Sequence, residues 1–125
     1  MEDEMDTIKE LKQIISEILD IDETEMGLDT YLIRDLNMES IDLLELSIAI
    51  NSKFKLEIDE GKAFLKDLRF ELRDVSKQGI SQREHLLATY PHLDKSRIDE
   101  ILKDLDGGPV LKLKDVVAYI DFLKK

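Results

Sequence analysis

The chain has 125 residues, no cysteine and a formal net charge of −11. Without cysteine it can form neither disulfides nor thiolate metal sites, and its negative charge makes nucleic acid and anionic membranes poor partners. Residues 1–4 are acidic, unlike a secretory signal, and no apolar stretch approaches the roughly 20 residues of a membrane span. We therefore expect a cytoplasmic protein without stable membrane insertion.

The first predicted helix begins at Thr7 and ends near Asp20. Thr7 and Glu10 have the spacing of a capping box, and apolar residues then recur at helical spacing as far as Leu19. Residues 20–38 are predicted to form a long loop. Scattered apolar side chains along it suggest that packing pins the loop to the core.

The second predicted helix runs from Ser40 to about Lys53. Ser40 is its expected N-cap, because a serine oxygen readily accepts a hydrogen bond from a first-turn amide. Apolar residues occupy most of the helix circumference, which predicts burial on more than one side.

A third predicted helix spans about residues 61–75. Along it, four basic residues at helical spacing would form a continuous stripe: Lys62, Lys66, Arg69 and Arg73. This stripe either contacts a partner or the acidic second helix, or is a solvated face.

Three shorter helical segments complete the chain. Ser81 opens the first of them, Asp94 or Ser96 caps the next, and residues 106–109 end it because they contain two glycines and a proline. The last predicted helix runs from about Leu113 to the C-terminus. No convincing strand is found, so the predicted fold class is all-α.

Sequence patterns of catalytic and metal sites are missing. There is no Gly-x-Ser-x-Gly motif and no glycine-rich phosphate loop. His85 and His92 are seven residues apart with Pro91 between them, which does not suit a helical zinc site. Residues 20–31 resemble a calcium-binding loop but lack its glycine and its final glutamate. We expect neither a metal site nor an enzyme.

Residues 35–46, with the sequence DLNMESIDLLEL, resemble the carrier motif of acyl carrier proteins. The family motif is D-L-G-x-D-S-L-D, followed by an apolar pair and E-L. Here Asn37, Glu39 and Ile41 replace Gly, Asp and Leu. Asparagine tolerates the left-handed backbone that glycine would adopt. The resemblance extends over residues 7–58 and 113–123.

The resemblance implies an acyl-carrier-like four-helix bundle with additional inserted helices. Residues 1–60 and 109–125 would form the bundle, and residues 61–108 would be a helical insertion packed on the same domain. In the family the motif serine, here Ser40, takes 4′-phosphopantetheine from coenzyme A, and the thiol of this arm carries acyl groups as thioesters. The chain would be a specialised carrier for fatty-acid, lipid or related biosynthesis.

The resemblance also implies residues for docking and for cargo. The acidic side chains Glu39, Asp42 and Glu45 would meet basic patches on a phosphopantetheinyl transferase and on acyltransferases or synthases. An acyl chain would lie between the second helix and the others. Five residues are expected to line this space or to belong to the core: Leu43, Leu44, Leu46, Ile48 and Ile50. We expect a monomer.

Two other functions fit the same residues. One is a helical interaction or regulatory protein that has kept the fold without the arm, which the departures at Asn37 and Glu39 favour. The other is an aminoacyl or peptidyl carrier, which the acids near Ser40 disfavour. A gain in mass after incubation with coenzyme A and a transferase separates carriers from the arm-less protein.

Overall fold

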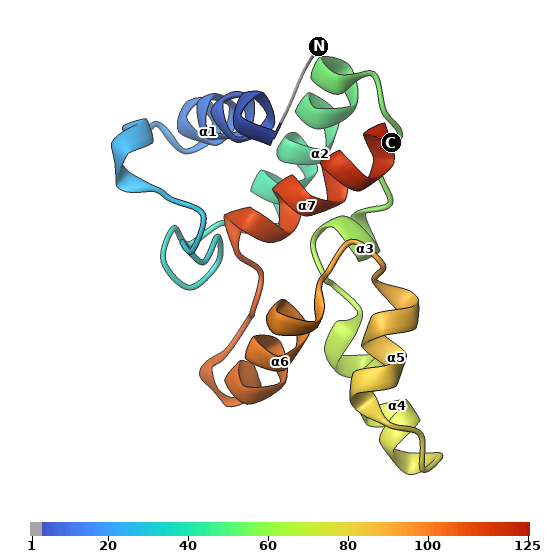
Figure 1. Ribbon diagram of the computed structural model, residues 1–125. Coiled ribbons are helices and arrows are strands. Elements are labelled where there is room, and N and C mark those ends of the chain that lie inside the picture. Colours follow the sequence, from blue (N-terminus) through green and yellow to red (C-terminus); the bar gives the residue numbers. More distant parts are fainter. Residues whose placement is uncertain (1–3) are drawn as a thin grey trace.

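The computed structural model describes residues 4–125, and within this part of the chain the regular elements are all helices, which confirms the all-α class (Figure 1). Its elements in chain order are α1 (Glu4–Leu19), η1 (Glu23–Glu25), α2 (Ser40–Phe54), α3 (Glu60–Ala63), α4 (Leu68–Lys77), α5 (Gln82–Thr89), α6 (Lys95–Asp104), η2 (Leu105–Gly107) and α7 (Leu113–Lys124). Between residues 4 and 125, none of the helices has the length and apolar character needed to cross a membrane.

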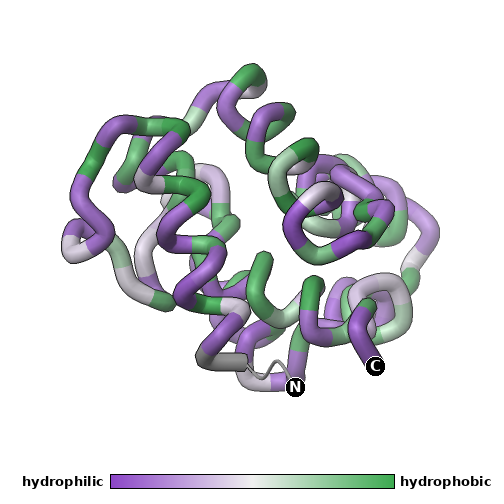
Figure 2. The backbone as a smooth tube through the Cα atoms, turned by 90° about the horizontal axis from the view of Figure 1, so that it is seen from above, coloured by the Kyte–Doolittle hydropathy of each residue, from purple (hydrophilic) through white to green (hydrophobic). Residues whose placement is uncertain are grey.

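Helices α1, α2 and α7 form one layer, with α1 packed against both others (Figure 1). α3 packs on α7, and the hairpin-like series α4, α5 and α6 lies below this layer in the same view. Figure 2 shows hydrophobic and hydrophilic residues alternating along most helices, as amphipathic packing requires. A continuous cluster of buried side chains joins both parts, from Leu11 and Ile50 to Leu86 and Ile101.

Thr7 lies inside α1 and does not cap it, so the predicted capping box is wrong. The Thr7 side chain is fully buried, and its hydroxyl donates a hydrogen bond to Asp121 Oδ1 of α7 at 2.8 Å. A buried hydroxyl needs such a partner. The hydroxyl therefore joins the first and last helices.

The predicted single helix at 61–75 is wrong, because the structure has two helices there. α3 ends at Ala63, α4 begins at Leu68, and Leu65 between them has a left-handed backbone with φ +55°. Phe64, Leu65 and Leu68 are all buried. One straight helix would turn the adjacent side chains of Phe64 and Leu65 about 100° apart, whereas the break lets both reach the core.

The break also divides the predicted basic stripe. Lys66 Nζ pairs with Glu60 Oε1 at 2.8 Å, and Arg69 donates to the carbonyl oxygen of Leu105 at 2.6 Å. The stripe is therefore neither continuous nor a purely solvated face.

The caps predicted for the next two helices are confirmed. Ser81 Oγ accepts a hydrogen bond from Glu84 N at 3.2 Å, and Asp94 Oδ1 accepts one from Arg97 N at 2.8 Å. These side chains satisfy amides that the helix itself leaves free.

A buried ion pair joins α6 to α7. Arg97, whose side chain is 6% exposed, binds Asp115 through Nε–Oδ1 at 2.7 Å and Nη2–Oδ2 at 2.8 Å. Arg97 Nη2 also donates to the carbonyl oxygen of Val110 at 2.7 Å, and Asp115 Oδ2 accepts from Lys112 N at 2.9 Å. Two N–H groups of one guanidinium thus bind the two oxygens of one carboxylate, and this bidentate arrangement is among the strongest hydrogen-bonded ion pairs in proteins.

Asp115→Ala should therefore lower the free energy of unfolding by about 3–5 kcal/mol, because it leaves the Arg97 charge buried without a partner. Urea unfolding followed by circular dichroism measures the change. The control is Asp99→Ala, which breaks the exposed pair with Arg83 and should cost at most about 1 kcal/mol. Equal losses in both variants would contradict this account of the buried pair.

His92 is the other notable polar group of this region. Its ring lies edge-on between those of Tyr90 and Tyr119, with centroids 6.1 and 5.0 Å away, and neither ring nitrogen has a hydrogen-bond partner among the described residues. Burial lowers the pKa of His92 to about 4. The Asp115 charge partly opposes this shift, and Lys62 adds to it.

This depressed pKa makes the fold sensitive to acid. In the unfolded chain the His92 pKa is about 6.5, so above this pH the ring is neutral in both states. As the pH falls from 6.5 towards 4, the unfolded chain binds a proton that the folded state does not, and the folded state loses stability. Near pH 4.5 this loss is on the order of 2 kcal/mol relative to pH 7.

His92→Phe should reduce the acid sensitivity of the free energy of unfolding by that amount in urea unfolding at pH 7 and 4.5. His85→Phe, the control, should keep the wild-type loss, and an unchanged loss in His92→Phe would rule out this role.

Candidate functional site

Ser40 is the first residue of α2, and its side chain is exposed. The prediction that Ser40 is the N-cap is wrong, because Glu39 holds that position. Asp42 Oδ2 accepts from Glu39 N at 2.8 Å and so satisfies the cap amide. The Ser40 hydroxyl makes no hydrogen bond to any described part of the chain and is therefore available to an incoming reagent.

The backbone around Ser40 suits an anion. The amides of Ser40 and Ile41 have no acceptor among the described residues, since the first helical bond of α2 is donated by Leu43 to Glu39 and the Asp42 amide donates to the Glu39 side chain in the capping box. Free first-turn amides and the helix dipole favour negative charge at this end. A phosphodiester on the Ser40 oxygen therefore fits the residues present.

The loop before Ser40 is pinned to the core, as predicted. Asn37 has the left-handed backbone expected of it, with φ +59°, and its amide donates to Ile33 O at 3.0 Å. Met38 is buried, and its amide donates to Leu32 O at 3.1 Å; Leu32 N in turn donates to Leu111 O at 3.1 Å. These bonds fix where α2 starts and hence where Ser40 is presented.

The acidic residues predicted for docking lie at this end of α2. Glu39 and Glu45 are exposed, and Asp42 is half-buried because it caps the helix. The three carboxylates thus lie within the first two turns of α2, the end at which Ser40 stands.

An apolar face accompanies these acids, and sequence reasoning missed it. Ile41, Leu44 and Ile48 are 57%, 44% and 61% exposed. The prediction that α2 is buried on more than one side is wrong for this face. The signal in the sequence was the apolar character all round the helix, which burial and docking explain equally well.

The residues predicted to line an acyl-chain space fall into three groups. Leu46 and Ile50 are fully buried core residues, and Leu44 and Ile48 face solvent, so the prediction that Leu44 and Ile48 line an interior space is wrong. Leu43 alone of the five lines a cavity, which has a volume of about 230 Å³.

This cavity lies within one helical turn of Ser40, because Leu43 follows Ser40 by three residues. Its walls are mostly apolar and include Phe64, Leu65 and Leu68 from the α3–α4 turn and Val110 from the segment before α7. Sequence reasoning missed these wall residues. Phe64, Leu65 and Leu68 were expected within the single helix at residues 61–75, and the break at Leu65 changes the direction of their side chains.

Comparison with known proteins agrees with this site. The family model for the phosphopantetheine attachment site matches residues 9–66. An acyl carrier protein from Campylobacter jejuni subsp. doylei is 34% identical over 121 residues, which cover 97% of this chain and 100% of that protein. This match therefore extends across residues 61–108.

Shorter matches include the acyl carrier proteins of Cyanophora paradoxa and Helicobacter hepaticus. The first is 34% identical over 56% of this chain and 68% of its own length, and the second is 37% identical over 47% and 78%. No solved structure matches the chain. The chain therefore belongs to the acyl carrier protein family, whose members bear covalently attached 4′-phosphopantetheine and are carriers rather than enzymes.

Proposed function

We propose that Ser40 is the residue that carries 4′-phosphopantetheine and that the protein passes acyl groups between enzymes of fatty-acid, lipid or related biosynthesis. The observation that supports this most directly is an exposed, unbonded hydroxyl next to the two free amides of Ser40 and Ile41. In the loading step the Ser40 oxygen forms a bond to the phosphate of coenzyme A, and the nucleotide part leaves. The arm then supplies a thiol on which an acyl group is held as a thioester.

We propose that Glu39, Asp42 and Glu45 dock basic patches of the transferase and of the synthases. Each exposed ion pair contributes only about 0.2–1 kcal/mol, which suits contacts that form and break in every cycle. The long-range field of the acids speeds the encounter. The exposed side chains of Ile41 and Ile48 add apolar contact area at the same face.

We propose that the cavity beside Leu43 holds the acyl chain. At roughly 27 Å³ for a close-packed methylene, the 230 Å³ cavity accommodates a chain of about eight carbons. Each buried methylene stabilises the sheltered state by roughly 0.8 kcal/mol. Lys66 and Arg69 are the two charged residues among its walls, and the other lining residues are apolar, so an acyl chain has mostly apolar surface to bind.

This proposal also assigns a role to the insertion. Residues 1–60 and 109–125 are the carrier unit, and residues 61–108 are packed on the same domain and complete its cavity. The support is that Phe64, Leu65 and Leu68 form walls of the cavity, and that Arg97 binds Asp115 of the carrier unit.

Ser40→Ala should abolish loading. Incubation with coenzyme A, magnesium and a phosphopantetheinyl transferase should add the mass of phosphopantetheine to the wild type and nothing to the variant, as read by intact-protein mass spectrometry. Ser52→Ala, an exposed serine on the same helix, is the matched control and should load fully. Loading of Ser40→Ala, or none in the wild type, would reject the proposed attachment site.

Glu45→Lys should weaken docking without blocking chemistry. We expect the KM of the transferase for the carrier to rise roughly three- to tenfold with little change in kcat, because one exposed ion pair is lost and a repulsion is added. The effect should shrink at 0.5 M salt. Glu17→Lys makes the same charge change on the exposed side of α1. If both variants behave alike, net charge and not the α2 face controls docking.

A further inference from the structure

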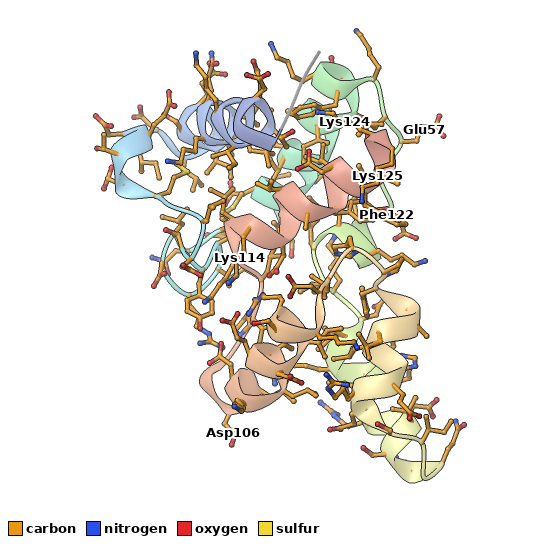
Figure 3. The ribbon with its side chains drawn as sticks, viewed as in Figure 1. Glu57, Asp106, Lys114, Phe122, Lys124 and Lys125 are labelled. Atoms are coloured by element: carbon orange, nitrogen blue, oxygen red, sulfur yellow. The ribbon has the colours of Figure 1, made fainter. Side chains whose placement is uncertain are left out.

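The insertion ends in a turn that borders the cavity through Pro109. Residues 104–109, called the gate turn below, connect α6 to the segment before α7, and Pro109 and Val110 line the cavity. Figure 3 shows Asp106 at the outer tip of this turn, far from the labelled C-terminal residues of α7.

Two arginines hold the gate turn. Arg34, from the loop that leads to Ser40, binds Asp104 Oδ1 through Nη1 at 3.0 Å, and its Nη2 donates to the carbonyl oxygens of Asp104 at 3.1 Å and Gly108 at 2.9 Å. Arg69, from α4, donates through Nη2 to the carbonyl oxygens of Leu105 at 2.6 Å and of Gly108.

A third side chain also binds the gate turn. Within residues 4–125, the other side-chain hydrogen bond that reaches it is donated by the Tyr31 hydroxyl to Asp104 Oδ2 at 2.6 Å. Tyr31 also carries the Arg34 guanidinium over its ring, 4.1 Å from the centroid. The turn thus depends on side chains that reach it from two other elements.

The gate turn is shaped around Arg34. A Cβ atom added at Gly107 would lie 2.9 Å from Arg34 Nη1, so a larger residue would push the guanidinium away. Gly108 has φ +114°, a backbone that favours glycine, and its position leaves room for the Arg34 side chain. Two adjacent glycines therefore give Arg34 its close approach to the turn.

Arg69 connects the gate turn with the cavity itself. Its side chain lines the 230 Å³ cavity and also a smaller hollow of about 140 Å³ beside Leu105. The aliphatic stem of an arginine packs against apolar surface while its guanidinium binds polar groups. A chain in the cavity would consequently lie against Arg69.

We propose that the gate turn controls access to the acyl cavity and that Arg34 and Arg69 are the positioning residues that keep it closed. This inference rests on the proposed function of Ser40 and its cavity. An acyl chain long enough to fill the cavity leaves it readily only when the hydrogen bonds from Arg34 and Arg69 to the gate-turn carbonyls break. A two-carbon acyl group does not extend as far as these arginines. The insertion therefore lengthens the time for which medium-length cargo is sheltered.

The test compares octanoyl and acetyl forms of the protein, loaded from the matching acyl coenzyme A. Hydroxylamine attacks the thioester carbonyl, gives the acyl hydroxamate and frees the thiol, and mass spectrometry follows the rate. In the wild type the octanoyl form should react several-fold more slowly than the acetyl form. Arg34→Gln and Arg69→Gln should each reduce this ratio of rates at least threefold, and Arg34→Lys should give an intermediate ratio because lysine lacks the planar fork.

Arg83→Gln is the matched control, because Arg83 lies in the same insertion but pairs with exposed Asp99; it should keep the wild-type ratio. Gly107→Ala displaces Arg34 without changing charge and replaces Arg34→Gln if that variant does not fold. An unchanged ratio in the folded Arg34 and Arg69 variants, or equal rates for both wild-type forms, overturns the gate. Failure of the proposed function would look different, since the wild type would then not load at Ser40.

Discussion

The ion pair between Arg97 and Asp115 is the interaction on which the rest of this architecture depends. It is buried, hydrogen-bonded at both carboxylate oxygens, and shared between α6 and the last helix, α7. Through the Val110 carbonyl it also sets the position of the segment that lines the cavity. Removing either partner would leave a buried charge without a partner in a region of low dielectric, so the pair and the shared core together hold α6 against α7.

The start of α2 shows how stability and function are divided between neighbouring residues. Capping is carried out by Glu39 and Asp42, so Ser40 contributes no hydrogen bond to the fold. The exposed apolar side chains of Ile41, Leu44 and Ile48 likewise contribute little to the core. The Ser40 hydroxyl and the three exposed apolar side chains are thus groups that the fold does not use, and the pinned loop before them supplies the rigidity.

Much of the helical structure could be predicted from sequence because its signals are local. The caps at Ser81 and Asp94, the left-handed Asn37 and the start of α7 depend on residues only a few positions apart. Errors occurred where distant residues decide the outcome. Thr7 has the spacing of a cap, but Asp121 on the last helix gives its hydroxyl a buried partner instead.

The sequence by itself determined the helical class, the carrier motif and the identity of the serine within it, since periodicity and a contiguous motif do not need coordinates. The tertiary structure alone decided which side of α2 is exposed, where the insertion breaks at Leu65, and that Arg34 and Arg69 meet at one turn. Apolar side chains look the same in a sequence whether they are buried or exposed. A contact between residues 34 and 108 depends on the folded path of the whole chain between them.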